Sequence, residues 1–226
     1  MGGHGLQTEP GGLVNNGRNL IVQRWMDQVF GPLRNSKYME YAKDINQAST
    51  HLLEIISDIL ELSKIEVGEA AFTPEETSLT DIVEYCMSIL KQQAEVKGIN
   101  LQQSVLPDTS KIWADRNMLK QILFNIIGNS IKFTNDGGLV RVETDLETDG
   151  TISITVSDTG VGIPADSIAT AVEPFGQVRD SAHVSHEGTG LGLPLAKQRV
   201  ELHGGVLSIE SEVGMGTSVK MTFPQP

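Results

Sequence analysis

Hydrophobic residues in the first third of the chain recur with the period of a helix that packs against other helices. They form a heptad seam and a flanking row within residues 37–66: Ile45, Ala48, Leu52, Ile55, Ile59 and Leu62 in the seam, and Leu53, Ile56 and Leu60 beside it. Gly68 follows as the expected end of this helix. An earlier apolar stretch ends at Gly31 and Pro32, because proline lacks an N–H group and restricts the residue before it. We therefore predict a helical hairpin over residues 19–68. Its wide apolar face predicts that two chains pair their hairpins into a four-helix bundle.

The pattern changes after about residue 76, where helical stretches and period-two stretches both occur. One helix is expected to open with Ser78 and Asp81 as a capping box and to close at Gly98, and a second helix covers residues 115–134. Apolar residues then alternate with polar ones in three stretches: Val140 and Val142; Ile152, Ile154 and Val156; and Val219, Met221 and Phe223. These patterns predict a sheet covered by helices on one face.

The expected fold class is therefore α+β, with a helical hairpin followed by a two-layer α/β sandwich. We assign residues 69–75 to a linker and residues 76–226 to the sandwich domain. Residues 1–18 are rich in Gly and Asn and carry no apolar period, so we expect a flexible leader or an added expression tag.

The composition excludes several functional classes. The net charge of −12 leaves no basic surface for nucleic acid. The single cysteine, Cys86, excludes an internal disulfide and a cysteine-based zinc site, and its apolar neighbours predict a buried thiol. No apolar run has the length of a membrane span and no signal peptide is visible, which predicts a cytoplasmic chain without a membrane segment.

The stretch NIIGNSIKFTNDGG, residues 125–138, places Asn125, Asn129 and Lys132 on one helix face at about 100° of rotation per residue. Amide oxygens are neutral hard ligands that suit Mg²⁺ held mainly by nucleotide phosphates and water. Lys132 supplies a charge for a phosphate, and Phe133 supplies a flat apolar surface for a base or ribose. A plain solvent-facing helix is the alternative. Two Asn and a Gly within five positions are poor helix formers, and this counts against a plain solvent-facing helix.

Glycines mark two further stretches. In SDTGVGIP, Asp158 ends a predicted strand, and Gly160 and Gly162 allow a tight turn beside a carboxylate that can accept a hydrogen bond from an exocyclic amine. This pattern alone is weak, because Asp and Gly are ordinary turn residues. In EGTGLGLP, glycines at positions 188, 190 and 192 lead into a helix whose exposed N–H groups suit an anionic phosphate.

The stretch EPFGQVRDSAHVSHE before the second glycine-rich stretch is polar and predicts a mobile lid with Phe175 as its hydrophobic anchor. His183 and His186 lack a third ligand nearby, so we interpret them as solvated lid residues and not as a zinc site.

Five segments together resemble the nucleotide-binding boxes of sensor histidine kinases. In chain order, NIIGNSIKFT, DTGVGIP, EPFGQV, GTGLGLPLAK and GMGTSVKMTF are similar to the N, G1, F, G2 and terminal glycine boxes of that family. The stretch YAKDINQASTHLLEIISDILELSKIEVGE resembles the second helix of the family's dimerisation domain. The resemblance covers roughly residues 19–226. Each box alone is weakly specific, but five in the family's order and spacing are hard to obtain by chance.

The resemblance implies the histidine kinase core of a two-component system, with a GHKL-type ATP-binding catalytic domain. It implies ATP and Mg²⁺ as cofactors, a response regulator receiver domain as a partner, and a homodimer formed through the hairpin. Asp158 would hold the adenine amine, Asn129 and Asn125 would hold Mg²⁺, and Asn125 and Lys132 would be catalytic. The implied nucleotide-binding residues are Asn125, Asn129, Lys132, Phe133, Asp158, Gly160, Gly162, Ile163, Phe175, Gly188, Thr189, Gly190, Leu191, Gly192 and Thr217.

A missing carboxylate separates this chain from related ATPases. Type II topoisomerases, mismatch-repair ATPases and heat-shock chaperones carry a Glu in the N-box helix, where it activates water as a general base. The matching position here resembles Asn125, and an amide cannot take a proton at neutral pH. The sequence therefore favours phosphoryl transfer to a protein side chain over hydrolysis.

The chain departs from the family at the phosphoacceptor. The family carries the acceptor on the first hairpin helix, in a motif resembling H-E-L-R-T-P, but residues 5–50 contain no histidine. His4 lies in the leader, and we interpret His51 and His203 as a packing residue and a helix-end residue. No phosphoacceptor is identified, so we expect the chain to bind ATP without phosphorylating itself on the usual histidine. Truncation or replacement of the first helix and natural degeneracy both account for this. The change of composition after the leader favours truncation or replacement.

Two other functions remain open. A degenerate kinase could act as a non-catalytic scaffold that binds a response regulator or a partner kinase, with ATP as a conformational ligand. A serine-directed kinase of the anti-sigma type shares the nucleotide boxes but normally has no dimerisation hairpin, so the heptad seam counts against it.

Overall fold

The computed structural model describes residues 36–176 and 189–226, and the chain divides into two compact units, Met1–Glu61 and Leu62–Pro226. Helix α2 (Ser36–Glu66) supplies the described part of the first unit. Gly68 follows it with a φ of 72°, the left-handed conformation expected after a helix end. The seam residues Ile45, Leu52 and Ile59 are exposed on α2. The first hairpin helix and the leader lie outside the described residues, so the four-helix bundle stays a prediction.

The second unit contains a five-stranded sheet in the order β2-β4-β5-β7-β6. Its strands are β2 (Asn100–Ser104), β4 (Leu139–Leu146), β5 (Ile152–Asp158), β6 (Val206–Glu212) and β7 (Gly216–Phe223). Strand β2 pairs with β4 in parallel, whereas all other neighbours pair antiparallel. Strands β1 (Glu75–Ser78) and β3 (Lys111–Ala114) form a separate antiparallel ribbon.

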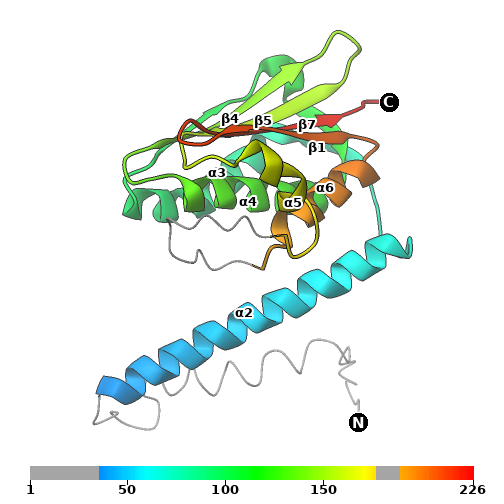
Figure 1. The fold of residues 1–226 in the computed structure, drawn as a ribbon. Helices are drawn as coiled ribbons and strands as arrows, with labels where there is room; N and C mark the ends of the chain where they lie inside the picture. The colour runs from blue at the N-terminus through cyan, green and yellow to red at the C-terminus, as the bar shows by residue number, and fades with distance from the viewer. Residues whose placement is uncertain (1–35, 177–188) are drawn as a thin grey trace, which may run out of the picture. The chain divides into compact units, whose positions relative to one another are not determined.

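Three helices cover one face of the sheet: α3 (Leu79–Val96), α4 (Arg116–Phe133) and α6 (Gly192–Leu202) (Figure 1). The short helix α5 (Ile168–Ala171) and two single turns, Pro107–Thr109 and Ala165–Ser167, complete the described elements. All the alternating residues predicted to face the core are buried against these helices: Val140, Val142, Ile152, Ile154, Val156, Val219, Met221 and Phe223. The predicted α+β class and the two-layer sandwich are confirmed. No helix within the described ranges is long and apolar enough to cross a membrane.

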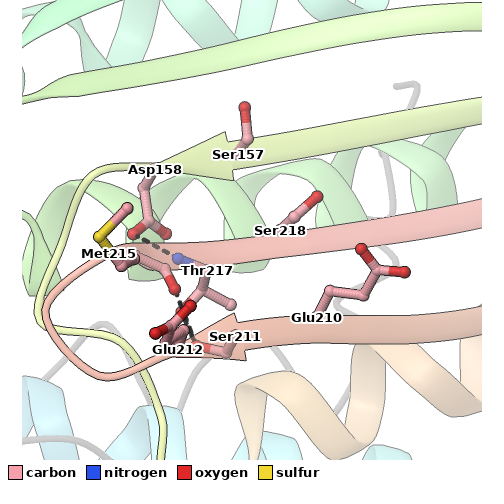
Figure 2. A pocket seen from close by; sticks show the side chains of 9 residues that line it. Ser157, Asp158, Glu210, Ser211, Glu212, Met215, Thr217 and Ser218 are labelled. Atoms are coloured by element: carbon pink, nitrogen blue, oxygen red, sulfur yellow. Dashed lines mark hydrogen bonds between the residues drawn. The ribbon is translucent and has the colours of Figure 1, made fainter.

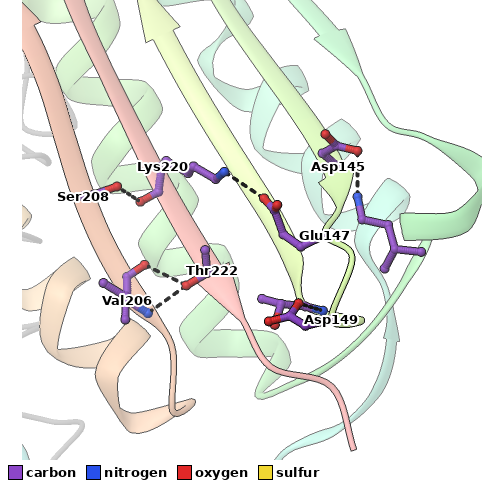
Figure 3. A network of polar contacts seen from close by, with 9 residues as sticks. Asp145, Glu147, Asp149, Val206, Ser208, Lys220 and Thr222 are labelled. Atoms are coloured by element: carbon purple, nitrogen blue, oxygen red, sulfur yellow. Dashed lines mark hydrogen bonds and ion pairs between the residues drawn. The ribbon is translucent and has the colours of Figure 1, made fainter.

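The other face of the sheet carries polar side chains. Figure 3 shows part of it, where the Lys220 Nζ atom lies 2.8 Å from the Glu147 carboxylate and the Thr222 hydroxyl bonds with the backbone of Val206. This ion pair lowers the pKa of Glu147 and raises that of Lys220. Exposed pairs of this kind contribute little to stability. Because the side chains on this face are polar and can stay in water, the face needs no covering layer.

Specific caps set the ends of the sandwich helices. The Ser78 hydroxyl accepts a hydrogen bond from the Asp81 N–H at 3.1 Å, which is one of the two hydrogen bonds of the predicted capping box. Gly98 ends the segment after α3 with a φ of 62°. The Lys97 ammonium donates to the carbonyls of Ile131, Lys132 and Thr134 at 2.8–2.9 Å. A cation thereby satisfies the last carbonyls of α4, where the helix dipole favours positive charge.

A buried polar cluster ties the segment before β1 to the start of α4. The Asp115 carboxylate caps α4 by accepting the N–H groups of Asn117 and Met118, and its second oxygen accepts the N–H and hydroxyl of Thr73, all at 3.0 Å. The Asp115 N–H donates to His203 Nε2 at 3.0 Å, and His203 Nδ1 lies 2.6 Å from the Arg199 carbonyl. His203 also makes an edge-on contact with Phe72, at 4.8 Å between ring centroids. The cluster joins segments that lie more than 80 residues apart in sequence.

Candidate functional site

Asp158 lies at the end of β5 with its carboxylate held by the surrounding backbone. Its Oδ1 atom accepts the N–H of Gly160 at 2.9 Å and the N–H of Thr217 at 3.2 Å, and the Ser130 side chain adds a third hydrogen bond. Burial raises the pKa of Asp158 above its ordinary value, while these hydrogen bonds act in the opposite direction. The Asp158 carboxylate therefore has a fixed orientation in a partly buried environment, as specific recognition of a ligand requires.

A cavity of about 380 Å³ opens beside Asp158, lined by the ends of β5, β6 and β7 (Figure 2). Side chains alternate across a strand, so Asp158 shares the helix-covered face with Val156, whereas Ser157 and Ser218 point to the uncovered face. Figure 2 shows these serines directed away from the Asp158 carboxylate. The cavity therefore extends over the edge of the sheet, and only its Asp158 side belongs to the predicted site.

The turn after β5 packs too closely for side chains at its glycines. A Cβ atom on Gly160 would lie 2.5 Å from the Phe133 carbonyl oxygen and 2.8 Å from Asp158 Oδ1. Gly162 has a φ of 72°, and a Cβ there would collide with the backbone of Glu212. The Val161 N–H donates to the Phe133 carbonyl at 3.1 Å, which joins this turn to the end of α4. The G1-like and N-like segments are thus in direct contact.

The polar face of α4 reaches the start of α6. The Asn125 side-chain amide donates to the Gly192 carbonyl at 3.2 Å, so the nitrogen is engaged and the oxygen is the atom that could ligate a cation. Asn129 is partly buried, and its side chain has no hydrogen bond within residues 36–176 and 189–226. Lys132 Nζ lies 5.2 Å from the Phe133 ring centroid, and Phe133 as a whole is 37% exposed. The face therefore presents two amides, one cation and one aromatic ring.

The F-like and G2-like segments meet through their backbones. The Phe175 N–H donates to the Gly190 carbonyl at 3.1 Å, and a Cβ on Gly190 would lie 3.0 Å from the Phe175 Cα atom. Phe175 has a φ of 63°, a conformation that costs a bulky residue on the order of 1–3 kcal/mol and that is enriched at functional sites. The Thr189 hydroxyl accepts the Leu191 N–H at 3.1 Å, and Leu191 is buried. Gly188, His183 and His186 lie outside the described residues.

The structure thus brings most predicted site residues into two neighbouring sets. Asp158, Thr217 and the turn at residues 160–163 form one set, and α4 links this set to Gly192 and the Phe175–Gly190 contact. Two contributors were not predicted from the sequence. Ser130 bonds to Asp158, and the Ser211 hydroxyl accepts the Ile163 N–H at 2.7 Å. No local pattern marks either serine, because each is defined by a partner far away in the chain.

Comparison with known proteins identifies the class to which this site belongs. The family described as "Histidine kinase-, DNA gyrase B-, and HSP90-like ATPase" matches residues 114–226, half of the chain. The chain belongs to this family of ATPase domains, and the predicted resemblance is confirmed.

Several individual proteins that resemble this chain are named as histidine kinases. An uncharacterized sensor-like histidine kinase of Rhizobium meliloti is 42% identical over 197 residues, which cover 87% of this chain and 37% of that protein. The crystal structure of full-length ShkA in complex with AMPPNP superposes with a TM-score of 0.75 at 25% identity, over 92% of this chain and 42% of that one. The histidine kinase ThkA in complex with response regulator protein TrrA shares the fold, with a TM-score of 0.66 at 20% identity over 92% and 58% of the two chains. The chain spans 20–37% of the length of the first curated relatives.

Proposed function

We propose that this chain is the ATP-binding core of a histidine kinase in a two-component system. It would bind Mg-ATP and donate the γ-phosphate to a histidine, from which an aspartate of a response regulator would receive it. The observation that carries the proposal is the combination of a fixed Asp158 carboxylate with an α4 helix that contains no Asp or Glu. A site that holds adenine but offers no general base on this helix suits transfer to a side chain better than hydrolysis.

The described residues fit an adenine nucleotide. The partly buried Asp158 carboxylate can accept the exocyclic amine, and the glycines at 160 and 162 let a planar base approach the backbone. We assign Phe133 and Ile163 to the sides of the nucleotide. The N–H groups at the start of α6, which begins at Gly192 after Gly190 and Leu191, would face the phosphates with Thr189 beside them.

The residues of α4 fit a magnesium ion held mainly by phosphate. We assign Asn129 and the oxygen of Asn125 to the cation and Lys132 to a phosphate. The described residues contain no cluster of His, Cys, Asp and Glu that could hold a metal, so the amides are the available protein ligands. When bound, Mg²⁺ would neutralise the charge on the phosphates. The AMPPNP complex of ShkA supports an adenine nucleotide as the ligand.

The acceptor histidine would come from another hairpin. His203 is half-buried with both ring nitrogens engaged, and His51 on α2 lies 3.7 Å from Glu54 in no recognisable acceptor motif. We therefore expect no autophosphorylation of this sequence on the usual histidine. Phosphorylation of a hairpin that carries the H-E-L-R-T-P-like motif would instead occur in trans.

We also propose a response regulator receiver domain as partner and a homodimer formed through the exposed seam of α2, in a cytoplasmic protein. The ThkA–TrrA complex supports the first point, and the exposure of Ile45 and Leu52 supports the second. The absent acceptor motif favours a second candidate, a scaffold that binds its partner and uses ATP only as a conformational ligand.

Radiolabelled ATP separates the two candidates. The chain is incubated alone, with a separately made hairpin containing the acceptor motif, and with that hairpin plus a response regulator. If the chain is a kinase, it should acquire no label when incubated alone, and the added hairpin should acquire acid-labile label. The Asp158→Asn variant should leave the hairpin unlabelled. Binding of the response regulator without label on the hairpin would support the scaffold.

A further inference from the structure

The side chain of Ser211 on β6 forms hydrogen bonds with three residues close to Asp158. Its hydroxyl accepts the Ile163 N–H at 2.7 Å, donates to the Gly216 carbonyl at 2.9 Å, and lies 2.8 Å from the Thr217 hydroxyl. A serine hydroxyl has one proton and two acceptor sites. Since the proton goes to Gly216, both acceptor sites are used by Ile163 and Thr217. The hydrogen-bonding capacity of Ser211 is therefore filled.

This arrangement fixes the direction of the Thr217 hydroxyl. The three contacts of Ser211 form together only when Thr217 donates its proton to Ser211, which leaves the lone pairs of Thr217 Oγ1 as acceptors. The Thr217 N–H meanwhile donates to Asp158 Oδ1. Ser211 thus makes Thr217 an acceptor beside a carboxylate, and both groups suit a donor such as an exocyclic amine.

Ser211 also holds the turn that follows β5. Ile163 comes directly after Gly162, whose backbone already lies against Glu212 with no room for a Cβ atom. The bond from the Ile163 N–H to Ser211 is the hydrogen bond that joins residue 163 to the β6–β7 hairpin. Loss of the hydroxyl would leave a partly buried N–H unsatisfied. The turn would then be joined to the β6–β7 hairpin by the hydrogen bond from the Gly214 N–H to the Val161 carbonyl, at 2.8 Å, but residue 163 itself would no longer be held.

We infer that Ser211 is a positioning residue that sets the base specificity of the nucleotide site. It does so by orienting Thr217 as an acceptor and by holding Ile163 at the side of the base. This inference rests on the proposed function, since it assumes that Asp158 and Thr217 face an adenine. An oxo group, as in guanine, would meet only acceptors at this position, so the arrangement selects an amine.

The test compares Ser211→Ala with Ser211→Thr, which keeps a hydroxyl, and with Ser208→Ala on the opposite face of the same strand. Calorimetry measures the affinity of each protein for ATP, GTP and inorganic tripolyphosphate, and thermal unfolding checks the fold. Ser211→Ala should weaken ATP binding about tenfold, the loss expected for one hydrogen bond, and lower the preference for ATP over GTP. Tripolyphosphate binding should stay unchanged, Ser211→Thr should recover ATP affinity, and Ser208→Ala should resemble the wild type.

Two results would overturn the inference. One is an unchanged ATP/GTP ratio in Ser211→Ala, and the other is an equal loss for ATP and tripolyphosphate, which a purely structural role predicts. If Ser211→Ala does not fold, Thr217→Val removes the oriented hydroxyl from the other side and must lower the same ratio. Failure of the proposed function is distinguishable, because then the wild type itself would not bind ATP.

Discussion

The Asp115 cluster allows a quantitative prediction for the stability of the second unit. Asp115 is buried, and its carboxylate accepts four hydrogen bonds, two from the first turn of α4 and two from Thr73. Loss of a helix N-cap costs about 1 kcal/mol, and loss of each Thr73 bond costs roughly 1–1.5 kcal/mol. Asp115→Ala should therefore lower the free energy of unfolding by about 3–4 kcal/mol and Tm by about 10 °C.

Two further variants separate the cap from the Thr73 contact. Asp115→Asn keeps one acceptor oxygen for the cap but turns an NH₂ group toward Thr73, so it should cost about 2 kcal/mol. Thr73→Val should cost about 1 kcal/mol in the wild type and nearly nothing beside Asp115→Asn. The assay is urea unfolding followed by circular dichroism and by tryptophan fluorescence, since Trp113 lies on the adjacent strand β3. Fully additive costs, or an Asp115→Ala variant within 1 kcal/mol of the wild type, would refute the assigned roles.

Three other predictions concern pH, backbone space and thiol reactivity. Burial lowers the pKa of His203 below 6.5, so the unfolded chain binds a proton that the folded chain does not. The free energy of unfolding should therefore fall as the pH drops from 7 through about 6, and His203→Gln should flatten that part of the profile in urea titrations; an unchanged slope would contradict the assignment. Gly160→Ala should abolish ATP binding, because its Cβ atom would meet the Phe133 carbonyl. A Cβ atom at Gly128 would have no heavy atom within 4 Å, so Gly128→Ala should bind ATP normally in the same calorimetric titrations. Its free energy of unfolding should rise by about 0.5–1 kcal/mol. Equal ATP binding by the two variants would count against the close packing at Gly160. Burial raises the pKa of the Cys86 thiol to about 11, so a disulfide reagent at pH 8 should label it only in urea, whereas fast labelling of the native chain would show an accessible thiol.

Periodicity in the sequence was enough to predict several of the elements that face the core, but not β3 and β6, which also contribute apolar side chains to it. Helix α4 and strands β4, β5 and β7 were predicted because each buries an unbroken apolar face. Strands β1 and β2, with the sequences EETS and NLQQS, carry no such alternation. They form because β3 and β4 offer them backbone partners, and this pairing is a tertiary effect that local sequence does not encode.

The residues of the site also differ in whether the local sequence marks them or a distant partner defines them. Asp158 and the glycines were visible because backbone turns impose a residue type at each position. Ser211 was not, since its partner Ile163 lies 48 residues away. Asn125 was predicted as a magnesium ligand, and the structure adds a contact with Gly192 that the sequence did not suggest. Its role toward the metal stays a prediction.

Calorimetric titration of this chain with ATP and Mg²⁺, beside Asp158→Asn and a matched Asp145→Asn control, tests whether Asp158 recognises the adenine of a bound nucleotide. Asparagine keeps an oxygen for the N–H groups of Gly160 and Thr217 but replaces the other carboxylate oxygen with a donor, so the fold is retained while recognition of an amine is lost. Asp145 is an exposed carboxylate whose side chain bonds only its neighbouring backbone among the described contacts. If Asp158 holds the adenine amine, the wild type and Asp145→Asn should bind ATP saturably, and Asp158→Asn should lose affinity tenfold or more, as expected for a hydrogen bond to a charged group. Equal affinity of all three proteins, or no binding by the wild type at millimolar ATP, would contradict this assignment.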